Sequence, residues 1–536
     1  MSAARAAPAG TPLGDAFHLY DTTLRDGAQA EGITYSVQDK LAVARLLDEL
    51  GVGFIEGGWP GAMPKDTEFF ARAAAELSLR HAVLVAFGAT RKPGVLAADD
   101  RQVRALLDSQ AAVVTLVAKS DRRHVERALR TDATENRQMV VDTVALLVTE
   151  GRRVFVDLEH FFDGYANDPQ HGIGVVEAAV QAGADVAVLC DTNGGMLPLR
   201  VAEVVAEVGA KTGARLGIHC QDDTACAVAS SVSAVQAGAT HVQCTANGYG
   251  ERTGNADLFA VIGNLATKLH MPVLPEGNLA DLVRVSHALA ELANSAPEPR
   301  QAYVGSSAFA HKAGLHASAI KVDPELYNHL DPAVVGNDMR VLVTEMAGRA
   351  SVELKGRELG VDLSGHGEAV GRVVERVKEL ESRGWSFEAA DASFELLLRR
   401  EAHGHTAAPF ELESYRVILE HRADGHTLSE ATVRGRVAGE RVLATAEGNG
   451  PVNALDAALR TALRPHHPWV DEVELADYKV RILDGQQGTD AVTRVLIESV
   501  DGARRWTTVG VDDNVVEASW LALVDAMAYG ALRTRA

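Results

Sequence analysis

The chain has 536 residues, more than one hydrophobic core usually serves, so we expect two or three domains. Hydrophobic residues make up 47% and charged residues 23%, as in an ordinary globular protein. The 73 acidic residues outnumber the 52 Lys and Arg residues, and the formal net charge of -21 disfavours nucleic acid and anionic membranes as partners.

Residues 1–16 are mostly small, contain Pro and Gly, and lack the apolar stretch of a signal peptide, so we expect a disordered tail. We find no apolar run as long as a membrane span. The four cysteines, Cys190, Cys220, Cys226 and Cys244, form neither a C-x-x-C pair nor a zinc-finger spacing. This pattern fits a reduced, cytoplasmic protein best.

Residues 17–280 contain short apolar runs at intervals of roughly thirty residues, the length of one strand and one helix. The runs are residues 17–20, 53–56, 82–87, 113–117, 154–158, 186–190, 216–219 and 241–244. Eight such units over roughly 250 residues predict an α/β fold, the (β/α)8 TIM barrel. A doubly wound sheet is the alternative, but the Gly-rich turn that usually follows its first strand is absent.

In a TIM barrel, the residues just past the carboxyl end of each strand face the active site. Here those positions are rich in carboxylate, imidazole and amide groups: Asp21, Arg25, Asp26, Glu56, Lys119, Glu159, Asp191, Thr192, Asn193, His219 and Asn247. Such oxygen and nitrogen donors are the ligands that a divalent cation needs. A lone strand-end His or an Arg–Asp pair is more often structural, so the prediction depends on the whole set.

The rest of the chain divides into two further segments. Residues 281–408 are mostly helical by pattern and are expected to form linker or lid subdomains. Residues 409–536 alternate apolar and polar positions and contain two similar strand–turn–helix units, which predict an α+β domain. The turns carry Gly448, Asn449, Gly450 and Asn514. The backbone N–H groups of a helix start could bind a carboxylate effector there, although tight turns alone explain the glycines.

Several long motifs resemble those of the DRE-TIM metallolyases. They are DTTLRDGAQ (21–29), LEHFFDGY (158–165), CDTNGG (190–195), NGYGERTGN (247–255) and FAHKAGLH (309–316). The resemblance extends from residue 17 to the end of the chain and is to the branch that condenses acetyl-CoA with 2-keto acids. This branch includes the 2-isopropylmalate, homocitrate and citramalate synthases. The motifs IEGGWPGAMPKD, AEGNGPVNALDAALR and DYKVRILDG are most similar to those of the citramalate synthases.

The resemblance implies a divalent cation (Mg²⁺, Mn²⁺ or Zn²⁺) bound by Asp26, His219 and Asn255. Where the family has a second His ligand, this chain has Gln221. A Gln carbonyl binds hard cations but is weaker than imidazole for transition metals. The alternatives are a site tuned to Mg²⁺ or Mn²⁺, compensation by Asp222 or Asp223, and a weakened site.

The resemblance also implies catalytic roles. Arg25 would stabilise negative charge on oxygen, Thr192 would bind the substrate carboxylate, and Glu159, His316 and Tyr327 would serve the proton transfers. His316 would come from the segment after the barrel, and a partner subunit could supply it. A second departure from the family lies after the fourth strand, in LVAKSDRRHV (116–125), and bears on the keto-acid pocket.

The implied reaction is condensation of acetyl-CoA with pyruvate, in isoleucine synthesis. The implied assembly is a homodimer whose C-terminal domain binds isoleucine. Three alternatives stay open: the same chemistry on a larger 2-keto acid, carbon–carbon cleavage by an aldolase or lyase on the same barrel, and a metal-weakened homologue that acts as an amino-acid sensor. One methylene in the pocket changes binding by only about 1–3 kcal/mol, so the sequence does not decide the keto acid.

Overall fold

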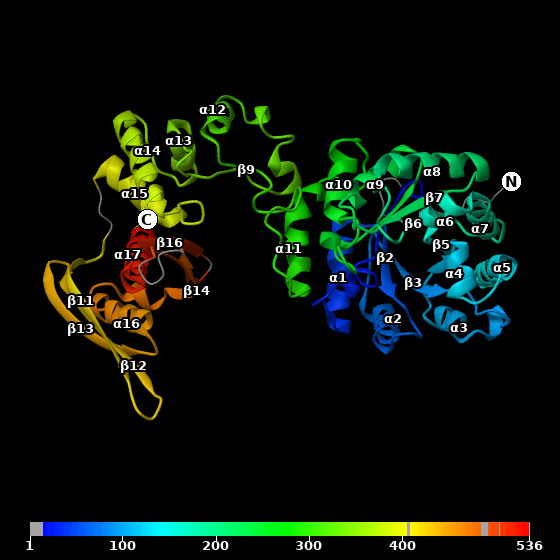
Figure 1. Ribbon diagram of the computed structural model, residues 1–536, viewed down its shortest axis with the longest axis horizontal. Coiled ribbons are helices and arrows are strands. Elements are labelled where there is room, and N and C mark those ends of the chain that lie inside the picture. The colour runs from blue at the N-terminus through cyan, green and yellow to red at the C-terminus, as the bar shows by residue number, and fades with distance from the viewer. Residues whose placement is uncertain (1–13, 405–407, 484–490, 503, 535–536) are drawn as a thin grey trace. The chain divides into compact units, whose positions relative to one another are not determined.

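The computed structural model describes residues 14–404, 408–483, 491–502 and 504–534 (Figure 1). Most of the expected N-terminal tail, residues 1–13, lies outside the described residues. The chain forms two compact units. The barrel unit runs to Phe309 and includes Leu330–Asp338, and the second unit comprises Ala310–His329 and the chain from Met339 onward.

The barrel unit is built on a closed barrel of eight parallel strands in chain order. The strands are β1 (His18–Asp21), β2 (Phe54–Gly58), β3 (Val83–Ala89), β4 (Val113–Lys119), β5 (Arg153–Glu159), β6 (Val186–Asp191), β7 (Leu216–Cys220) and β8 (His241–Cys244). β1 pairs with β2 on one side and β8 on the other, which closes the barrel. Each predicted apolar run overlaps one strand, so the predicted TIM barrel is confirmed and the doubly wound sheet is wrong.

Helices surround the strands (Figure 1). They are α1 (Val37–Leu50), α2 (Pro64–Glu76), α3 (Arg101–Asp108), α4 (Arg122–Arg127), α5 (Ala133–Thr149), α6 (Phe161–Asn167), α7 (Pro169–Gln181), α8 (Pro198–Thr212), α9 (Ala227–Gln236), α10 (Leu258–Thr267) and α11 (Leu282–Leu292). The sequence sets the ends of α1 locally. Ser36 and Asp39 form a capping box at its start, and Gly51 ends it in the left-handed region with φ 101°.

Alternation along the strands separates two apolar layers. In β1, Leu19 belongs to the layer between strands and helices, whereas its neighbour Tyr20 belongs to the layer inside the barrel. Phe54 and Phe155 fill the interior beside Tyr20, with their ring centroids 5.3 Å apart. The barrel is therefore a packed core, and polar groups further along the strands stand at its carboxyl end.

The second unit begins with helices and a short parallel pair, β9 (Ala310–His311) with β10 (Arg340–Val341). Its first four helices are α12 (Gly314–Val322), α13 (Arg349–Glu358), α14 (Gly367–Ser382) and α15 (Asp391–His403). The apolar faces of α13, α14 and α15 form a core that includes Val352, Val373 and Phe394. The predicted helical segment is thus present before the C-terminal domain.

The C-terminal domain consists of two similar repeats, each of three antiparallel strands and a helix. The first contains β11 (Glu411–His421), β12 (Thr427–Val437), β13 (Glu440–Gly448) and α16 (Pro451–Leu463). The second contains β14 (Glu474–Ile482), β15 (Thr493–Asp501), β16 (Arg504–Asp512) and α17 (Val515–Thr534). Side chains of both helices share one apolar core. The predicted α+β domain and its internal repeat are confirmed.

α17 corrects the expectation that no segment is apolar and long enough to span a membrane. Its mean hydropathy is 1.4 over an 18-residue window, of which 61% is buried within the protein. Ala518, Leu523 and Met527 lie in the apolar core of the C-terminal domain. α17 therefore packs as a core helix, and its apolar character follows from that burial.

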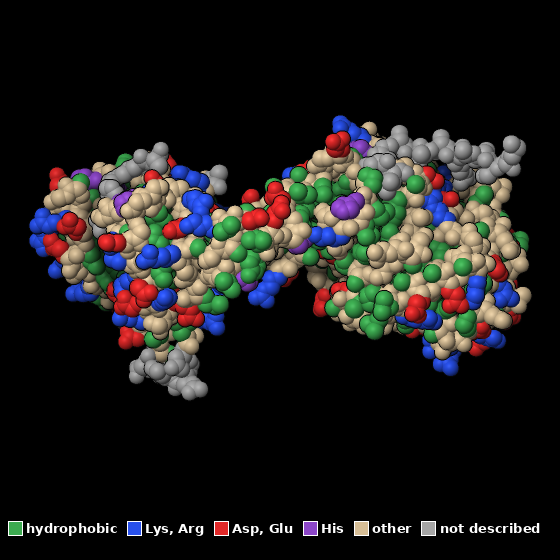
Figure 2. Space-filling model, turned by 90° about the horizontal axis from the view of Figure 1, so that it is seen from above, with side chains coloured by type: hydrophobic (Ala, Val, Ile, Leu, Met, Phe, Trp, Pro, Cys, Tyr) green, Lys and Arg blue, Asp and Glu red, His purple; other side chains and the backbone are tan. Residues whose placement is uncertain are grey.

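Charges of both signs are interspersed on the face of the two units seen in Figure 2. The acidic surplus behind the net charge of -21 does not form one continuous field on this face.

Candidate active site

Three side chains expected to bind a cation meet at the carboxyl end of the barrel. Asp26 follows β1, His219 lies in β7 and Asn255 follows β8. His219 Nε2 lies 3.2 Å from Asp26 Oδ2, and the Asn255 side chain hydrogen-bonds to Asp26. Each of the three residues is at most 6% exposed. The structure thus brings together groups that stand far apart in the sequence.

The charges in this cluster keep Asp26 ionised. Burial alone would raise the pKa of Asp26, but the charge of Arg25 and hydrogen bonds from His219 and Asn255 hold that pKa well below its usual value. Burial lowers the pKa of His219, whereas the hydrogen bond to Asp26 and its negative charge raise it, and the net change is a rise. A carboxylate is therefore ready to bind a cation here.

The loop that carries Asn255 depends on glycines. Gly254 has φ 91°, and a Cβ on it would lie 1.9 Å from the carbonyl oxygen of Gly248. A Cβ on Gly250 would lie 2.2 Å from Asn255 Nδ2, which donates a hydrogen bond to the Tyr249 carbonyl at 3.0 Å. Any larger side chain at Gly250 or Gly254 would displace Asn255 from the cluster.

Asn247 connects the same loop to the chain that follows the barrel. It adopts a left-handed conformation, with φ 54°. Its Oδ1 accepts hydrogen bonds from Ser286 Oγ at 2.6 Å and from Gln301 Nε2 at 3.0 Å. Gln301 also donates to Asp257, just beyond Asn255. Groups outside the eight strands therefore hold the loop in place.

Two buried amide oxygens at this end of the barrel, Gln221 Oε1 and Asn255 Oδ1, have no hydrogen-bond partner among the described residues. The two residues pair through their backbones in an isolated antiparallel bridge. A buried acceptor without a partner costs about 1–3 kcal/mol, so these oxygens need a donor or a cation. Together with Asp26 and His219, they make a donor set that fits Mg²⁺ or Mn²⁺.

Arg25 stands beside this donor set, held from several sides. Its Nη1 lies 3.3 Å from Asp26 Oδ2, and its Nε donates to the fully buried Glu56 at 2.5 Å. The guanidinium carbon lies 4.0 Å from the centroid of the Phe87 ring. Glu56 also accepts from Thr22 Oγ1 at 2.8 Å. The positive charge of Arg25 is therefore fixed next to the cluster before any substrate binds.

Two buried polar residues of the site, Asp157 and Gln243, are absent from our sequence predictions. Asp157 lies in β5, two positions beyond Phe155 of the interior layer, and Gln243 lies in β8, two positions beyond His241, whose ring packs on Phe155. Burial and the charge of Glu56 raise the pKa of Asp157 to about 7. The signal that could have found them is a polar residue inside an apolar strand on the face that points into the barrel.

Thr192 and Glu159 lie on neighbouring loops at the same end of the barrel. Thr192 Oγ1 accepts a hydrogen bond from the His160 backbone N–H at 2.8 Å. Arg252, in the loop after β8, donates to the Thr192 carbonyl at 2.9 Å and also to Asp223. These hydrogen bonds join the loops after β6, β7 and β8. Glu159, at the end of β5, pairs with Lys119 at the end of β4. The substrate and proton-transfer roles of Thr192 and Glu159 remain predictions.

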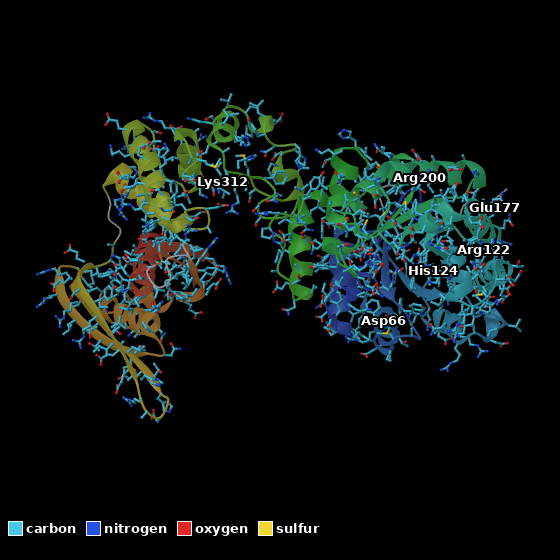
Figure 3. The ribbon with its side chains drawn as sticks, in the orientation of Figure 1. Asp66, Arg122, His124, Glu177, Arg200 and Lys312 are labelled. Carbon is cyan, nitrogen blue, oxygen red and sulfur yellow. The ribbon has the colours of Figure 1, made fainter. Side chains whose placement is uncertain are left out.

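The segment after β4, where the sequence departs from the family, has a local structural explanation. Asp121 caps α4 by accepting from the Arg123 backbone N–H at 2.8 Å. The ring of His124, on α4 (Figure 3), stacks on His160 with ring centroids 3.9 Å apart. Burial lowers the pKa of His160 to about 4. These contacts give Asp121 and His124 structural roles at the edge of the mouth.

His316 and Tyr327 belong to the second unit. His316 lies on α12, and its ring stacks on Tyr327 with centroids 4.2 Å apart. Tyr327 is 40% exposed, and Leu315, next to His316, is 76% exposed. The structure brings His316 and Tyr327 together, and their action on the barrel site remains a prediction.

The four predicted effector residues lie at the starts of the two repeated helices. Gly448 ends β13, Gly450 precedes α16, and the Asn449 backbone N–H donates to Asn453 Oδ1 at 3.2 Å. Asn514 Oδ1 accepts from the Val516 N–H at 2.9 Å and so caps α17. These bonds support the turn interpretation, and effector binding remains a prediction.

A cavity of about 350 Å³ opens between the loops after β1 and β2. Arg25 and Tyr35 line it, and the Tyr35 hydroxyl is buried without a partner among the described residues. Lys40 and Lys65 border it too; Lys40 is bound to Asp66 of α2, which Figure 3 labels. The cavity thus joins the cation cluster through Arg25, and its lining carries Lys65 beside the Lys40–Asp66 ion pair.

A second group of possible ligands lies at the opposite, amino end of the barrel. Asp15, His18 and Asp185 lie close enough together to hold an ion. Arg153 donates to Asp15 at 2.6 Å and to Asp185 at 2.7 Å, and Arg215 Nη2 lies 2.9 Å from His18 Nε2. Two guanidinium groups already neutralise this group, so it stabilises the barrel end and competes poorly as a cation site.

Comparison with known proteins places these residues in a family. Residues 16–289 match the HMGL-like family, residues 303–384 the homocitrate synthase post-HMGL domain-like family, and residues 388–531 the LeuA allosteric (dimerisation) domain. The chain is 64% identical to the (R)-citramalate synthase of Streptomyces coelicolor, over 97% of this chain and 98% of that protein. The chain belongs to the citramalate synthase family.

Other relatives agree with this assignment. The (R)-citramalate synthase of Aquifex aeolicus is 45% identical over 96% of this chain and 98% of that protein. A probable 2-isopropylmalate synthase of Methanopyrus kandleri is 31% identical over 97% and 99%. The resemblance drawn from the motifs is therefore confirmed. The four candidate ligands all lie in the HMGL-like region of this citramalate synthase family member. The four predicted effector residues lie in its LeuA region.

Proposed function

We infer that this chain condenses acetyl-CoA with pyruvate and then hydrolyses the thioester, giving (R)-citramalate and CoA. The observation that carries the proposal is the buried set of three oxygen-bearing side chains and one imidazole beside Arg25, within a chain 64% identical to an (R)-citramalate synthase. In the cell, this reaction would feed isoleucine synthesis in the cytoplasm, which four unpaired cysteines also suit.

Asp26, His219, Gln221 and Asn255 would hold the cation, which supplies a Lewis acid that orients the keto acid and polarises its carbonyl. Thr192 would bind the pyruvate carboxylate. A general base must take a proton from the acetyl methyl group so that this carbon can attack the keto carbon. Arg25 would then stabilise the negative charge that develops on the former keto oxygen, because its guanidinium is already fixed there.

Glu159, His316 and Tyr327 would share the proton transfers. One group accepts the methyl proton, and a proton is returned to the new alkoxide. Water then attacks the thioester carbonyl, and CoA leaves as the thiol after protonation of its sulfur. The stacked rings of His316 and Tyr327 support their joint action. Delivery of His316 from outside the barrel would exclude water until both substrates are bound.

The cavity beside Arg25 is the proposed entrance for acetyl-CoA. It borders the guanidinium, and its lining combines the unpartnered Tyr35 hydroxyl with Lys40 and Lys65. The Tyr35 hydroxyl suits the amide carbonyls of the CoA arm as a hydrogen-bond donor, and the Lys65 ammonium suits the CoA phosphates.

The C-terminal domain is the proposed site of dimerisation and of control by isoleucine. The match to the LeuA allosteric (dimerisation) domain supports a dimer, and the helix starts at Gly450 and Asn514 offer backbone N–H groups for a carboxylate. Equilibrium sedimentation and isoleucine inhibition of the full chain test the two parts separately.

The reaction is tested by following CoA thiol release from acetyl-CoA with pyruvate, 2-ketobutyrate and 2-ketoisovalerate, after EDTA treatment and after addition of Mg²⁺ or Mn²⁺. We expect release with pyruvate to exceed the others, to need a cation, and to yield the (R) product on chiral chromatography. Faster release with 2-ketoisovalerate would support the larger-substrate alternative. No release with any keto acid and cation would refute the enzyme and favour the sensor.

A further inference from the structure

Gln243 occupies the centre of the polar layer inside the barrel. It lies in β8 and is 1% exposed. Its Oε1 lies 2.8 Å from His219 Nδ1, and its Nε2 donates to Asp157 Oδ1 at 2.8 Å. The same Nε2 lies 3.4 Å from His241 Nε2. Every polar atom of this buried amide therefore has a partner.

These contacts belong to a closed ring of polar groups. Beyond Gln243, the second oxygen of Asp157 lies 4.0 Å from Arg25 Nη2, and Arg25 Nη1 lies 3.3 Å from Asp26 Oδ2. Asp26 Oδ2 in turn lies 3.2 Å from His219 Nε2. The ring joins two candidate cation ligands, Asp26 and His219, to the Arg25 guanidinium.

The chemistry of the amide decides the orientation of the imidazole. In its ionised form, which the positive charge of Arg25 favours, Asp157 offers only acceptors, so the NH2 group of Gln243 faces it and the amide oxygen faces His219. An amide oxygen accepts hydrogen bonds and does not donate them, so Nδ1 of the His219 ring must carry a hydrogen. Nε2, whose proton bonds to Asp26 when no cation is present, is then the ring nitrogen that a cation would bind in place of that proton.

We propose that Gln243 is a positioning residue that fixes the His219 tautomer for cation binding and, through Asp157, holds the Arg25 guanidinium in its place beside the cation site. It touches neither substrate nor cation. This inference rests on the cation site of the proposed function and is independent of which keto acid reacts.

Two substitutions separate positioning from simple packing. Gln243→Met keeps the length of the side chain but removes both hydrogen bonds. Gln243→Glu keeps an acceptor for His219 Nδ1 and loses the donor to Asp157. Thr143→Val is the matched control, because Thr143 is fully buried in α5 of the same unit and its hydroxyl donates to Met139 and accepts from the Arg91 N–H, away from the cluster.

The measurement is Mn²⁺ binding to the full-length protein, by titration with electron paramagnetic resonance, with circular dichroism and thermal unfolding as controls for folding. We expect Gln243→Met to weaken Mn²⁺ binding about 10- to 100-fold, as loss of a partner to a metal-binding His does elsewhere. Gln243→Glu should bind Mn²⁺ close to wild type but lower kcat about 10- to 100-fold, since Arg25 loses its alignment. Thr143→Val should lower the melting temperature and leave Mn²⁺ binding unchanged.

Wild-type Mn²⁺ affinity in a folded Gln243→Met protein would overturn the proposal. So would equal losses of affinity in the Met and Glu variants, because that result would assign Gln243 a packing role only. A protein that binds Mn²⁺ as expected but makes no citramalate would refute the proposed reaction and leave this inference standing.

Discussion

At the scale of single residues, Gln221 is the position where this chain differs most from the family pattern of its cation site. Its Oε1 is buried without a partner among the described residues, as is Asn255 Oδ1. An unpaired buried acceptor destabilises the folded protein, whereas a cation would turn the same oxygen into a ligand. The same atom therefore lowers stability when no cation is bound and contributes to binding when one is.

This dual role predicts opposite effects of Gln221→Leu. We expect the cation-free variant to be as stable as the wild type or more stable, by up to about 1 kcal/mol, because the unpaired oxygen is gone. Its Mn²⁺ affinity should fall at least about tenfold. Urea unfolding in EDTA and calorimetric Mn²⁺ titration measure the two quantities. Ser230→Ala removes another buried, unpaired oxygen and should leave Mn²⁺ affinity unchanged; an unaltered affinity in Gln221→Leu would exclude Gln221 as a ligand.

The sequence indicated the ligands but not the residues that align them. Asp26 and His219 stand at strand ends, where the fold directs side chains to the mouth, so their meeting followed from the strand count. Gln243 and Asp157 stand inside strands, where an apolar neighbour on each side suggests packing. Their role depends on the 2.8 Å contact between β8 and β5 side chains across the barrel, which no local pattern encodes.

At the scale of elements, the glycine loop after β8 determines where Asn255 stands. Gly254→Ala would place a Cβ against the Gly248 carbonyl in a backbone region that alanine rarely adopts. We expect this variant to keep its helix and strand content, as seen by circular dichroism, and to lose Mn²⁺ binding and activity.

The control is Gly238→Ala. Gly238 also has positive φ, 111°, but a Cβ added there would meet no atom within 4 Å beyond its own chain neighbours. It should lower the free energy of unfolding by about 1 kcal/mol and retain Mn²⁺ binding. If Gly254→Ala bound Mn²⁺ as tightly as Gly238→Ala, the loop would not depend on close packing at Gly254.

Elements with a regular pattern were predictable, and irregular ones were not. The eight strands followed from apolar runs at even spacing, and the start and end of α1 from Ser36, Asp39 and Gly51. The bridge between Gln221 and Asn255 was not predictable, because it joins loops that only the closed barrel brings together. The apolar character of α17 was missed because Glu517 and Asp525 interrupt its apolar residues, although the helix as a whole is apolar enough to pack as a core helix.

At the scale of the whole molecule, the second unit contains a buried carboxyl group between two of its helices. Asp525 of α17 accepts a hydrogen bond from Ser393 Oγ of α15 at 2.7 Å. Burial raises the pKa of Asp525 to about 6, and the hydrogen bond from Ser393 opposes this rise only in part. Because the folded state binds this proton more tightly than the unfolded chain, the contribution of Asp525 to stability is lost as pH rises from about 4 to 6.

Asp525→Asn should therefore stabilise the second unit at neutral pH and have little effect at pH 4. The pKa difference corresponds to about 3 kcal/mol at pH 7. Thermal unfolding between pH 4 and pH 7 measures the gain. Asp424→Asn is the control, because Asp424 is exposed and an Asn there still accepts from the His426 N–H. A gain independent of pH would contradict a buried, titrating Asp525.

The hydrogen bonds that Asn247 accepts from residues beyond the barrel determine how short a cation-binding fragment of this protein can be. A fragment that stops at residue 280 would retain all eight strands and every candidate ligand, yet it would lack Ser286 and Gln301, which hold Asn247. Without Ser286 and Gln301, the loop that carries Asn255 would sample many conformations and bind a cation weakly, although the barrel strands would stay folded. The shortest fragment that binds a cation should extend to about Phe309. A fragment that ends soon after β8 would keep the barrel fold but lose cation binding.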